Sequence, residues 1–284
     1  MCPTTFYNDN DPQISMWLKV LVDGGKLPPG RVDNRDIRDL TPADLDGYVH
    51  CHFFAGIGGW PLALELAGWP EAVPVWTGSP PCQPFSLIGK KKGFNDERDL
   101  WPIYAKLIRT KRPPILFGEQ VANAVANGWY DRLSDDLEAA GYTVGAAVIG
   151  ACAVGAPHKR QRLFWVAVSS ADKANLLRAL GDADQQGLER HTEHGEGSCK
   201  PGRQPAQADG YVATTSGLWG DGLWCQLADG KTRLVKPGIR LLVDGVPNRV
   251  VKLRGLGNAI VPQVAAEFIK SCILALTDTA NCVS

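Results

Sequence analysis

The chain has 284 residues, 44% of them hydrophobic and 21% charged, and its 30 basic and 30 acidic side chains balance to zero. This composition is typical of a soluble globular protein with one good core, or a core plus a small second domain. No apolar run approaches the length of a membrane span, and the first residues lack the pattern of a secretory signal, so we expect neither a membrane anchor nor export. The eight cysteines lack pairing spacings such as CxxC, which favours free thiols in a reducing, cytoplasmic compartment.

Residues 50–168 are predicted to alternate between strands and helices, after an amphipathic run at 14–21. Strands are expected at 52–54, 73–76, 115–117, 142–149 and 163–168, and helices at 61–66, 100–109 and 130–140. The helix at 100–109 carries apolar residues at helical spacing, and Pro113-Pro114 end it. Such alternation indicates an α/β fold with a mostly parallel sheet covered on both faces.

From about Ser169 to Gly222 the strong periodicity disappears and polar residues and glycine dominate, so a small, loop-rich insertion is predicted. Short apolar pieces at 234–253 are candidate strands. The segment 261–276 is apolar at helical spacing and is predicted to pack back on the main sheet. We therefore expect one domain from 1–168 plus 254–284, and a second from 169–253.

Basic residues gather in three places although the net charge is zero. The clusters are 90–92, 158–162 and a stretch from Lys231 to Arg254, where seven basic residues are opposed only by Asp244. Each cluster alone is equally consistent with solvated surface. Because two of them adjoin candidate catalytic motifs, together they favour a face that binds phosphate groups.

The tetrapeptide Pro80-Pro81-Cys82-Gln83 places a cysteine on a proline-stiffened turn after an apolar strand. A cysteine there is well placed to act as a nucleophile. Pro-Cys-Gln alone arises by chance, but this one lies between Phe54-Ala55-Gly56-Ile57-Gly58-Gly59 upstream and Gly118-Glu119-Gln120-Val121 downstream. Together the three motifs resemble the DNA (cytosine-5)-methyltransferase family.

The resemblance implies a Rossmann-like, S-adenosylmethionine-dependent methyltransferase sheet, with 169–253 in the place of a target-recognition domain. It implies methyl transfer from S-adenosylmethionine to carbon 5 of cytosine in double-stranded DNA, with the base flipped out of the helix. The compact chain suggests a monomeric phage or prophage enzyme that protects DNA from host restriction. No metal is expected, because the spacing of His191, His194 and Cys199 fits no standard zinc pattern.

Within the resemblance, the turn from Phe54 to Gly59 is the cofactor loop, where glycines allow the backbone to approach a ligand closely. Only 28 residues separate Phe54 from Cys82, too few for the two strand–helix units that the family places there. Similar segments at 7–12 and 32–40 precede the loop instead. A circular permutation is therefore predicted, and the alternative is that residues 1–50 are an unrelated extension.

The permutation assigns cofactor roles to residues at the start of the chain. Asp9, with Asn10 beside it, would bind the ribose in place of the family's usual Glu. Asp36 with Ile37 would meet the adenine. Pro81 is assigned to the cofactor site too, as are Asn258, Ala259 and Ile260, which match the family's last motif and would close the pocket.

The resemblance also implies four catalytic residues. Cys82 is the nucleophile, whose thiolate adds to carbon 6 of cytosine so that carbon 5 can take the methyl group. Glu119 matches the Glu of a Glu-Asn-Val motif that contacts cytosine N3 and the exocyclic amine, although Gln120 replaces the Asn. Arg160 and Arg162 match two alternating arginines, one for cytosine O2 and one to support the pocket, whereas His158 replaces a Gln.

Alternatives remain open at this point. The segment Lys90–Arg98 matches a mobile loop that closes over DNA, but it is also consistent with a plain surface loop. The same motifs suit methylation of RNA cytosine, or the use of a modified donor. A DNA-binding relative without activity is a third possibility, against which the intact catalytic motifs argue.

Overall fold

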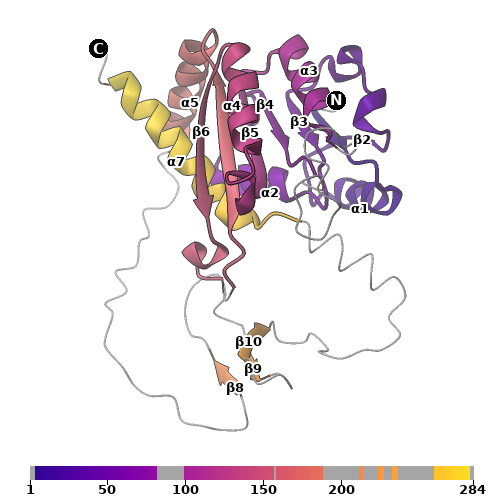
Figure 1. The fold of residues 1–284 in the computed structure, drawn as a ribbon, viewed down its shortest axis with the longest axis vertical. Coiled ribbons are helices and arrows are strands. Elements are labelled where there is room, and N and C mark those ends of the chain that lie inside the picture. Colours follow the sequence, from indigo (N-terminus) through magenta and orange to yellow (C-terminus); the bar gives the residue numbers. More distant parts are fainter. Residues whose placement is uncertain are drawn as a thin grey trace.

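The computed structural model describes residues 4–81, 99–156, 158–187, 211–213, 223–226, 232–235 and 259–281. Its main sheet has seven strands in the order β2-β1-β3-β4-β5-β7-β6. They are β1 (Thr5–Asn8), β2 (Gly30–Asp33), β3 (His50–Phe53), β4 (Val75–Gly78), β5 (Ile115–Val121), β6 (Tyr142–Ile149) and β7 (Arg162–Ser169). Strands β1 to β5 are parallel, and β7 runs antiparallel between β5 and β6. The predicted α/β fold with a mostly parallel sheet is confirmed (Figure 1).

Helices connect and cover these strands. They are α1 (Pro12–Asp23), α2 (Gly59–Ala67), α3 (Trp101–Lys111), α4 (Trp129–Ala139), α5 (Lys173–Gly187) and α7 (Pro262–Asn281), with short 3₁₀ helices η1 (Ile37–Asp39), η2 (Pro42–Leu45), η5 (Ala122–Ala124) and η6 (Ala151–Val154). α1 begins at Asp11, whose carboxylate accepts from the backbone N–H groups of Gln13 and Ile14. Among the described residues, no helix has the length and apolar character needed to cross a membrane.

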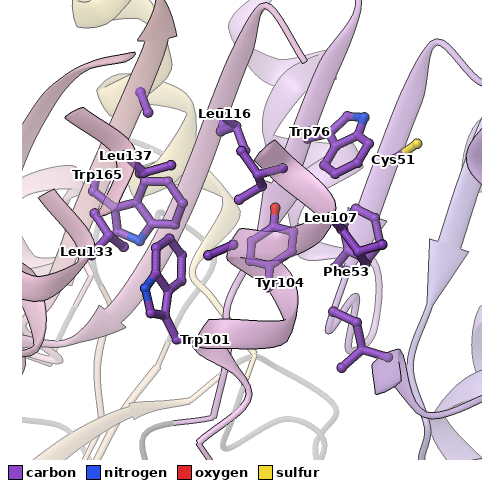
Figure 2. Close-up of a cluster of buried hydrophobic side chains, with 14 of the residues drawn as sticks. Cys51, Phe53, Trp76, Trp101, Tyr104, Leu107, Leu116, Leu133, Leu137 and Trp165 are labelled. Atoms are coloured by element: carbon purple, nitrogen blue, oxygen red, sulfur yellow. The ribbon is translucent and has the colours of Figure 1, made fainter. Parts of the chain in front are cut away.

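Alternate residues of the strands build a core on each face of the sheet. On one face Phe53, Trp76 and Trp165 pack against α3 and α4. Figure 2 shows Trp101 and Tyr104 on α3 within this cluster: the Trp101 ring lies edge-on to Trp165, and Tyr104 stacks on Trp76. On the other face, strand residues such as Val75 and Phe117 pack against α2, α5 and α7.

Helix α5 corrects one expectation from the sequence. The chain from 169 onward was expected to lack periodic structure, yet Lys173–Gly187 is helical. Leu176 and Leu180, one helical turn apart, are buried in the same cluster as Phe268 of α7. Leu176 and Leu180 form the apolar face of α5. Two residues are too few to give a recognisable helical periodicity in the otherwise polar sequence after residue 169. The boundary between the two expected domains stays a prediction, but α5 packs with the first unit.

A second sheet has three antiparallel strands in the order β10-β9-β8. They are β8 (Tyr211–Ala213), β9 (Leu223–Gln226) and β10 (Thr232–Val235). Of the candidate strands expected at 234–253, β10 covers the first two residues, and the rest lie outside the described residues.

Helices α1 and α2 lie on the same face of the main sheet. α1 packs on Tyr7 of β1, and α2 packs with Val75 of β4. Tyr7 pairs with His52, and His52 pairs with Thr77, two residues from Val75, so these side chains share a face. Yet β1–α1–β2 steps toward one edge of the sheet and β3–α2–β4 steps toward the other. The two connections join parallel strands and carry their helices on the same face, but they move in opposite directions across the sheet. Their crossovers must therefore have opposite hands.

The neighbouring connections identify the exceptional crossover. β4–α3–β5 steps in the same direction as β3–α2–β4 but carries its helix on the other face, so it has the hand of β1–α1–β2. The connection from β2 to β3, whose η1 and η2 lie on the face of α3, has that hand too. Nearly all such units are right-handed, which leaves β3–α2–β4 as the left-handed one. A right-handed unit would result if α2 led into β1.

Candidate active site

The candidate site lies at the carboxyl ends of four neighbouring parallel strands. Asp9 follows β1, the glycine turn 54–59 follows β3, the segment 79–81 follows β4, and Glu119 lies near the end of β5. In open α/β sheets this edge is where ligands bind. The fold therefore gathers candidate residues that are more than 100 positions apart in the sequence.

The glycine turn is formed by backbone that other residues rarely adopt. Gly56 and Gly58 have φ angles of 55° and 83°. A Cβ on Gly58 would lie 2.5 Å from Leu27, and one on Gly59 would lie 2.6 Å from Cγ1 of Ile260. The turn thus packs against the amino-terminal unit on one side and against the residues before α7 on the other.

Asp9 joins the amino-terminal unit to this turn. Its Oδ2 accepts the backbone N–H of Gly56 at 2.9 Å, and its Oδ1 accepts that of Asp11 at 3.0 Å. Burial raises the pKa of the Asp9 carboxyl, against the effect of these two hydrogen bonds. Asp9, which is predicted to bind the ribose, therefore also holds the glycine turn in place through Gly56.

The other expected residues of the amino-terminal unit lie close to one another. The Nδ2 of Asn10 donates to Oδ2 of Asp36 at 3.2 Å, across 26 residues of sequence. Arg38 holds the pKa of Asp36 at about 2 by a hydrogen-bonded ion pair. Ile37, in contrast, is only 2% exposed and packs in the core with Phe6, so any contact it makes with an adenine falls to its backbone.

Cys82 and Asn258 lie outside the described residues, but the chain leading to Cys82 is defined. Trp60 donates its indole N–H to Oγ of Ser79 at 3.0 Å, and Gln120 donates its Nε2 to the carbonyl of Pro80 at 3.0 Å. The amide in place of the family's Asn therefore contacts the segment that precedes the cysteine. Pro81 is partly buried.

Glu119 is buried at the end of β5, where it pairs with an arginine from β7. Nε of Arg162 lies 2.8 Å from Oε1 of Glu119, because the two antiparallel strands place these side chains together. Burial raises the pKa of Glu119 to about 7, although the charges of Arg162 and Arg160 oppose this. The carboxyl group is thus poised between its protonated and ionised forms near neutral pH.

Arg160 links this pair to the far side of the glycine turn. Its guanidinium donates to the carbonyl of Ala259, and the next residue, Ile260, packs against Gly59. Burial lowers the pKa of Arg160, and the neighbouring charge of Arg162 adds to this effect. The structure therefore brings Glu119, Arg162 and Arg160 together.

Trp60 and Ser79 are site residues that the sequence did not single out. Trp60 immediately follows the glycine turn, and Ser79 lies three residues before Cys82. A polar residue just before the prolines and a tryptophan just after the turn are the available signals. Neither signal indicates that the two side chains meet.

Comparison with known proteins supports the resemblance. Residues 69–196 match the family model of the C-5 cytosine-specific DNA methylases. The chain is 36% identical over 112 residues to the type II methyltransferase M.AplI of Arthrospira platensis, which covers 39% of this chain and 32% of that protein. It is 29% identical over 167 residues to M.HhaI of Haemophilus parahaemolyticus, which covers 45% of this chain and 51% of that protein. The chain thus spans from about a third to about a half of the length of these two relatives.

Solved structures with a similar arrangement include two methyltransferases of low identity. A putative DNA modification methyltransferase encoded within a prophage (E. coli) is 18% identical, with a TM-score of 0.40, over 60% of this chain and 41% of that one. A mutant of DNMT2 from Spodoptera frugiperda is 19% identical, with a TM-score of 0.39, over 58% and 42%.

The family match covers β4 to α5 and includes Cys82, Glu119 and both arginines. The relatives agree with the motifs read from the sequence. Over residues 69–196 this chain is thus similar to the C-5 cytosine-specific DNA methylases, both in the family model and in its relatives.

Proposed function

We propose that this chain transfers a methyl group from S-adenosylmethionine to carbon 5 of cytosine in duplex DNA, through a covalent adduct between Cys82 and a flipped base. The environment of Glu119 carries this proposal. Its carboxyl group is buried, paired with Arg162 and has a pKa of about 7. The next residue, Gln120, contacts the segment that leads to Cys82.

These groups suit the activation of a cytosine. Near neutral pH a fraction of Glu119 is protonated, so it can donate to N3 of a bound cytosine and offset the charge that develops there. Arg162, fixed by the carboxylate, keeps further N–H groups for cytosine O2. Both groups need the base outside the stacked duplex, which supports base flipping.

The proposed covalent step balances as an addition and an elimination. The thiolate of Cys82 bonds to carbon 6, and the electron pair that this releases makes carbon 5 nucleophilic. Carbon 5 would then take the methyl group as the bond between that methyl and the donor's sulfonium sulfur breaks, which leaves a neutral thioether. Carbon 5 would next lose its proton to solvent. The sulfur–carbon 6 bond breaks as the 5,6 double bond re-forms, which restores the thiolate and yields 5-methylcytosine.

The residues at the glycine turn fit the proposed cofactor. A Cβ built on Gly56 would meet no described atom within 4 Å, so open space adjoins the turn. Each oxygen of Asp9 accepts one backbone N–H and keeps a lone pair for a ribose hydroxyl. Asp36, Asn10 and Ile260 would complete the pocket. When bound, S-adenosylmethionine supplies an electrophilic methyl group.

The placement of this pocket supports a circular permutation within the family. The strands that precede Asp9 and Asp36 come first in the chain, yet β1 pairs with β3, which leads into the glycine turn, and β2 pairs with β1. An extension unrelated to the family would not be expected to form the strands of the sheet beside the glycine turn. We propose that residues 5–40 correspond to the cofactor strands that follow the glycine turn in other members.

Trapping on DNA that contains 5-fluorocytosine tests the covalent mechanism, because fluorine at carbon 5 blocks the final elimination. We expect the wild-type chain, with S-adenosylmethionine, to form a denaturation-resistant adduct on duplex DNA. Cys82→Ala should form none. The exposed Cys152 offers a matched control, and Cys152→Ala should form the adduct normally.

Parallel reactions separate the alternatives. Labelled cofactor with duplex DNA and with RNA distinguishes the acceptors, and the mass of the modified base identifies the transferred group. Label on RNA alone, or an adduct that survives Cys82→Ala, would contradict the proposal. An intact DNA-binding protein that gives neither label nor adduct would favour the inactive relative.

A further inference from the structure

The segment before Cys82 is held from two sides by buried side chains. Trp60, 2% exposed, reaches Ser79 from the start of α2. Gln120, 3% exposed, reaches Pro80 from the end of β5. These hydrogen bonds connect residues 19 and 40 positions apart in the sequence.

Both donors are themselves fixed. The Trp60 ring stacks on Phe117 and lies edge-on to Phe164, with ring centroids 6.4 and 6.3 Å apart. The amide oxygen of Gln120 accepts the backbone N–H of Val121 at 2.9 Å, so the orientation of the amide is set at both ends. Each donor is therefore a rigid support.

Among the described residues, the chain that leads to Cys82 ends at two prolines. Pro80 and Pro81 have no backbone N–H, so the segment depends on its carbonyl and side-chain groups. At Gly78, the last residue of β4, a Cβ would lie 2.7 Å from the Tyr104 ring, which closes the space beneath the strand end. The contacts of Ser79 and Pro80 are thus the last ones described before the cysteine.

We propose that Trp60 and Gln120 are positioning residues that set the Cys82 thiol relative to the cofactor and the base. Trp60 directly follows Gly59 of the glycine turn, and Gln120 directly follows Glu119. Each hydrogen bond therefore ties the cysteine segment to one of the two groups that the thiol must align with. This inference rests on the proposed covalent mechanism. Small errors in the placement of reacting atoms lower rates more than affinities.

The experiment measures the rate of adduct formation on 5-fluorocytosine DNA at saturating DNA and S-adenosylmethionine. Trp60→Phe removes the N–H and keeps an aromatic ring, and Gln120→Met removes the amide and keeps the length. We expect each to slow adduct formation about three- to tenfold, the worth of one buried hydrogen bond. The KM for DNA and the Kd for S-adenosylmethionine should stay within about twofold of wild type.

Trp69→Phe is the matched control. Trp69 is buried in the same cluster as Trp60 and also donates its indole N–H, but to the carbonyl of Val73, away from the cysteine segment. It should lose a similar amount of thermal stability and keep the wild-type adduct rate. Ser79→Ala added to Trp60→Phe should cost nothing further, because both remove the same hydrogen bond.

The outcomes separate this inference from the proposed function. A wild-type chain that forms no adduct overturns both. A wild-type adduct with an unchanged rate in Trp60→Phe and Gln120→Met overturns only the positioning role. Equal slowing in Trp69→Phe would show that lost stability explains the effect, and it would also overturn the inference.

Discussion

Glu119→Gln should stabilise this protein at alkaline pH while it removes the proposed proton donor. The ordinary pKa of 4.5 rises to about 7 in the folded chain, chiefly because the carboxyl group is buried. A raised pKa means that the folded state holds its proton more tightly than the unfolded chain. This contribution is fully present below pH 4.5 and is lost as the pH rises through about 7.

The difference between the two pKa values corresponds to about 3 kcal/mol of unfolding free energy, lost in full by about pH 8. Glutamine carries no charge and can still accept from Nε of Arg162, so its burial does not depend on pH. Between about pH 4.5 and pH 8 the wild type should therefore lose about 3 kcal/mol relative to Glu119→Gln. Other titrating groups cancel, because both chains share them.

Urea unfolding of the two chains at about pH 4.5, 6 and 8 measures this difference. The gap between their unfolding free energies should open in favour of Glu119→Gln as the pH rises. Methyl transfer by the variant should fall about a hundredfold or more, the usual size of a general-acid contribution. A gap that stays constant with pH would refute the raised pKa, and with it the proton donation proposed for Glu119.

Two other substitutions test the cofactor pocket and the core. Asp9→Asn should weaken S-adenosylmethionine binding about tenfold or more, measured by calorimetry. Asp9 accepts the N–H groups of Gly56 and Asp11 with its two oxygens, whereas an asparagine has one oxygen and would turn its NH₂ group toward one of these donors. Asp11→Asn is the control: it keeps a good helix cap and should bind the cofactor normally. Unchanged affinity in Asp9→Asn would refute the amino-terminal cofactor strands. Gly118→Ala places a Cβ 2.1 Å from the indole of Trp165 and should cost about 1–3 kcal/mol in urea unfolding. Trp165→Phe in the same chain should recover part of that loss; a Gly118→Ala chain as stable as wild type would contradict the tight packing.

Periodicity predicted most of the main sheet because its strands and helices are regular and strongly apolar. The strand at 142–149 was predicted with the bounds that the structure shows. Glu119 was expected just after a strand at 115–117, but β5 runs on to Val121 because β7 pairs with it as far as Arg162. Long-range antiparallel pairing extended the strand, and no local pattern carries that information.

Motif reading located the charged groups of the site but not how they are supported. The alternate spacing of the arginines predicted an extended segment on which both point the same way, but Arg160 has a φ of 28° and lies before β7, which begins at Arg162. Arg162 pairs with Glu119, and Arg160 bonds to the carbonyl of Ala259. The bond from Trp60 to Ser79 depends on side-chain rotamers and on the packing of α2. Asp9 was predicted as a ligand, and its second role as a clamp on Gly56 required the three-dimensional pairing of β1 with β3.

The left-handed crossover explains why the short gap before Cys82 is informative. A chain that evolved the connection β3–α2–β4 directly would be expected to place its helix on the face that gives a right-handed unit. Here α2 stays on the face where it packs with α7 and supports the glycine turn. That face suits a helix leading into β1, the neighbour of β3 on the other side. The crossover thus agrees with the proposed permutation, in which α2 keeps the position it would have in an unpermuted chain, packed against α7 and the glycine turn.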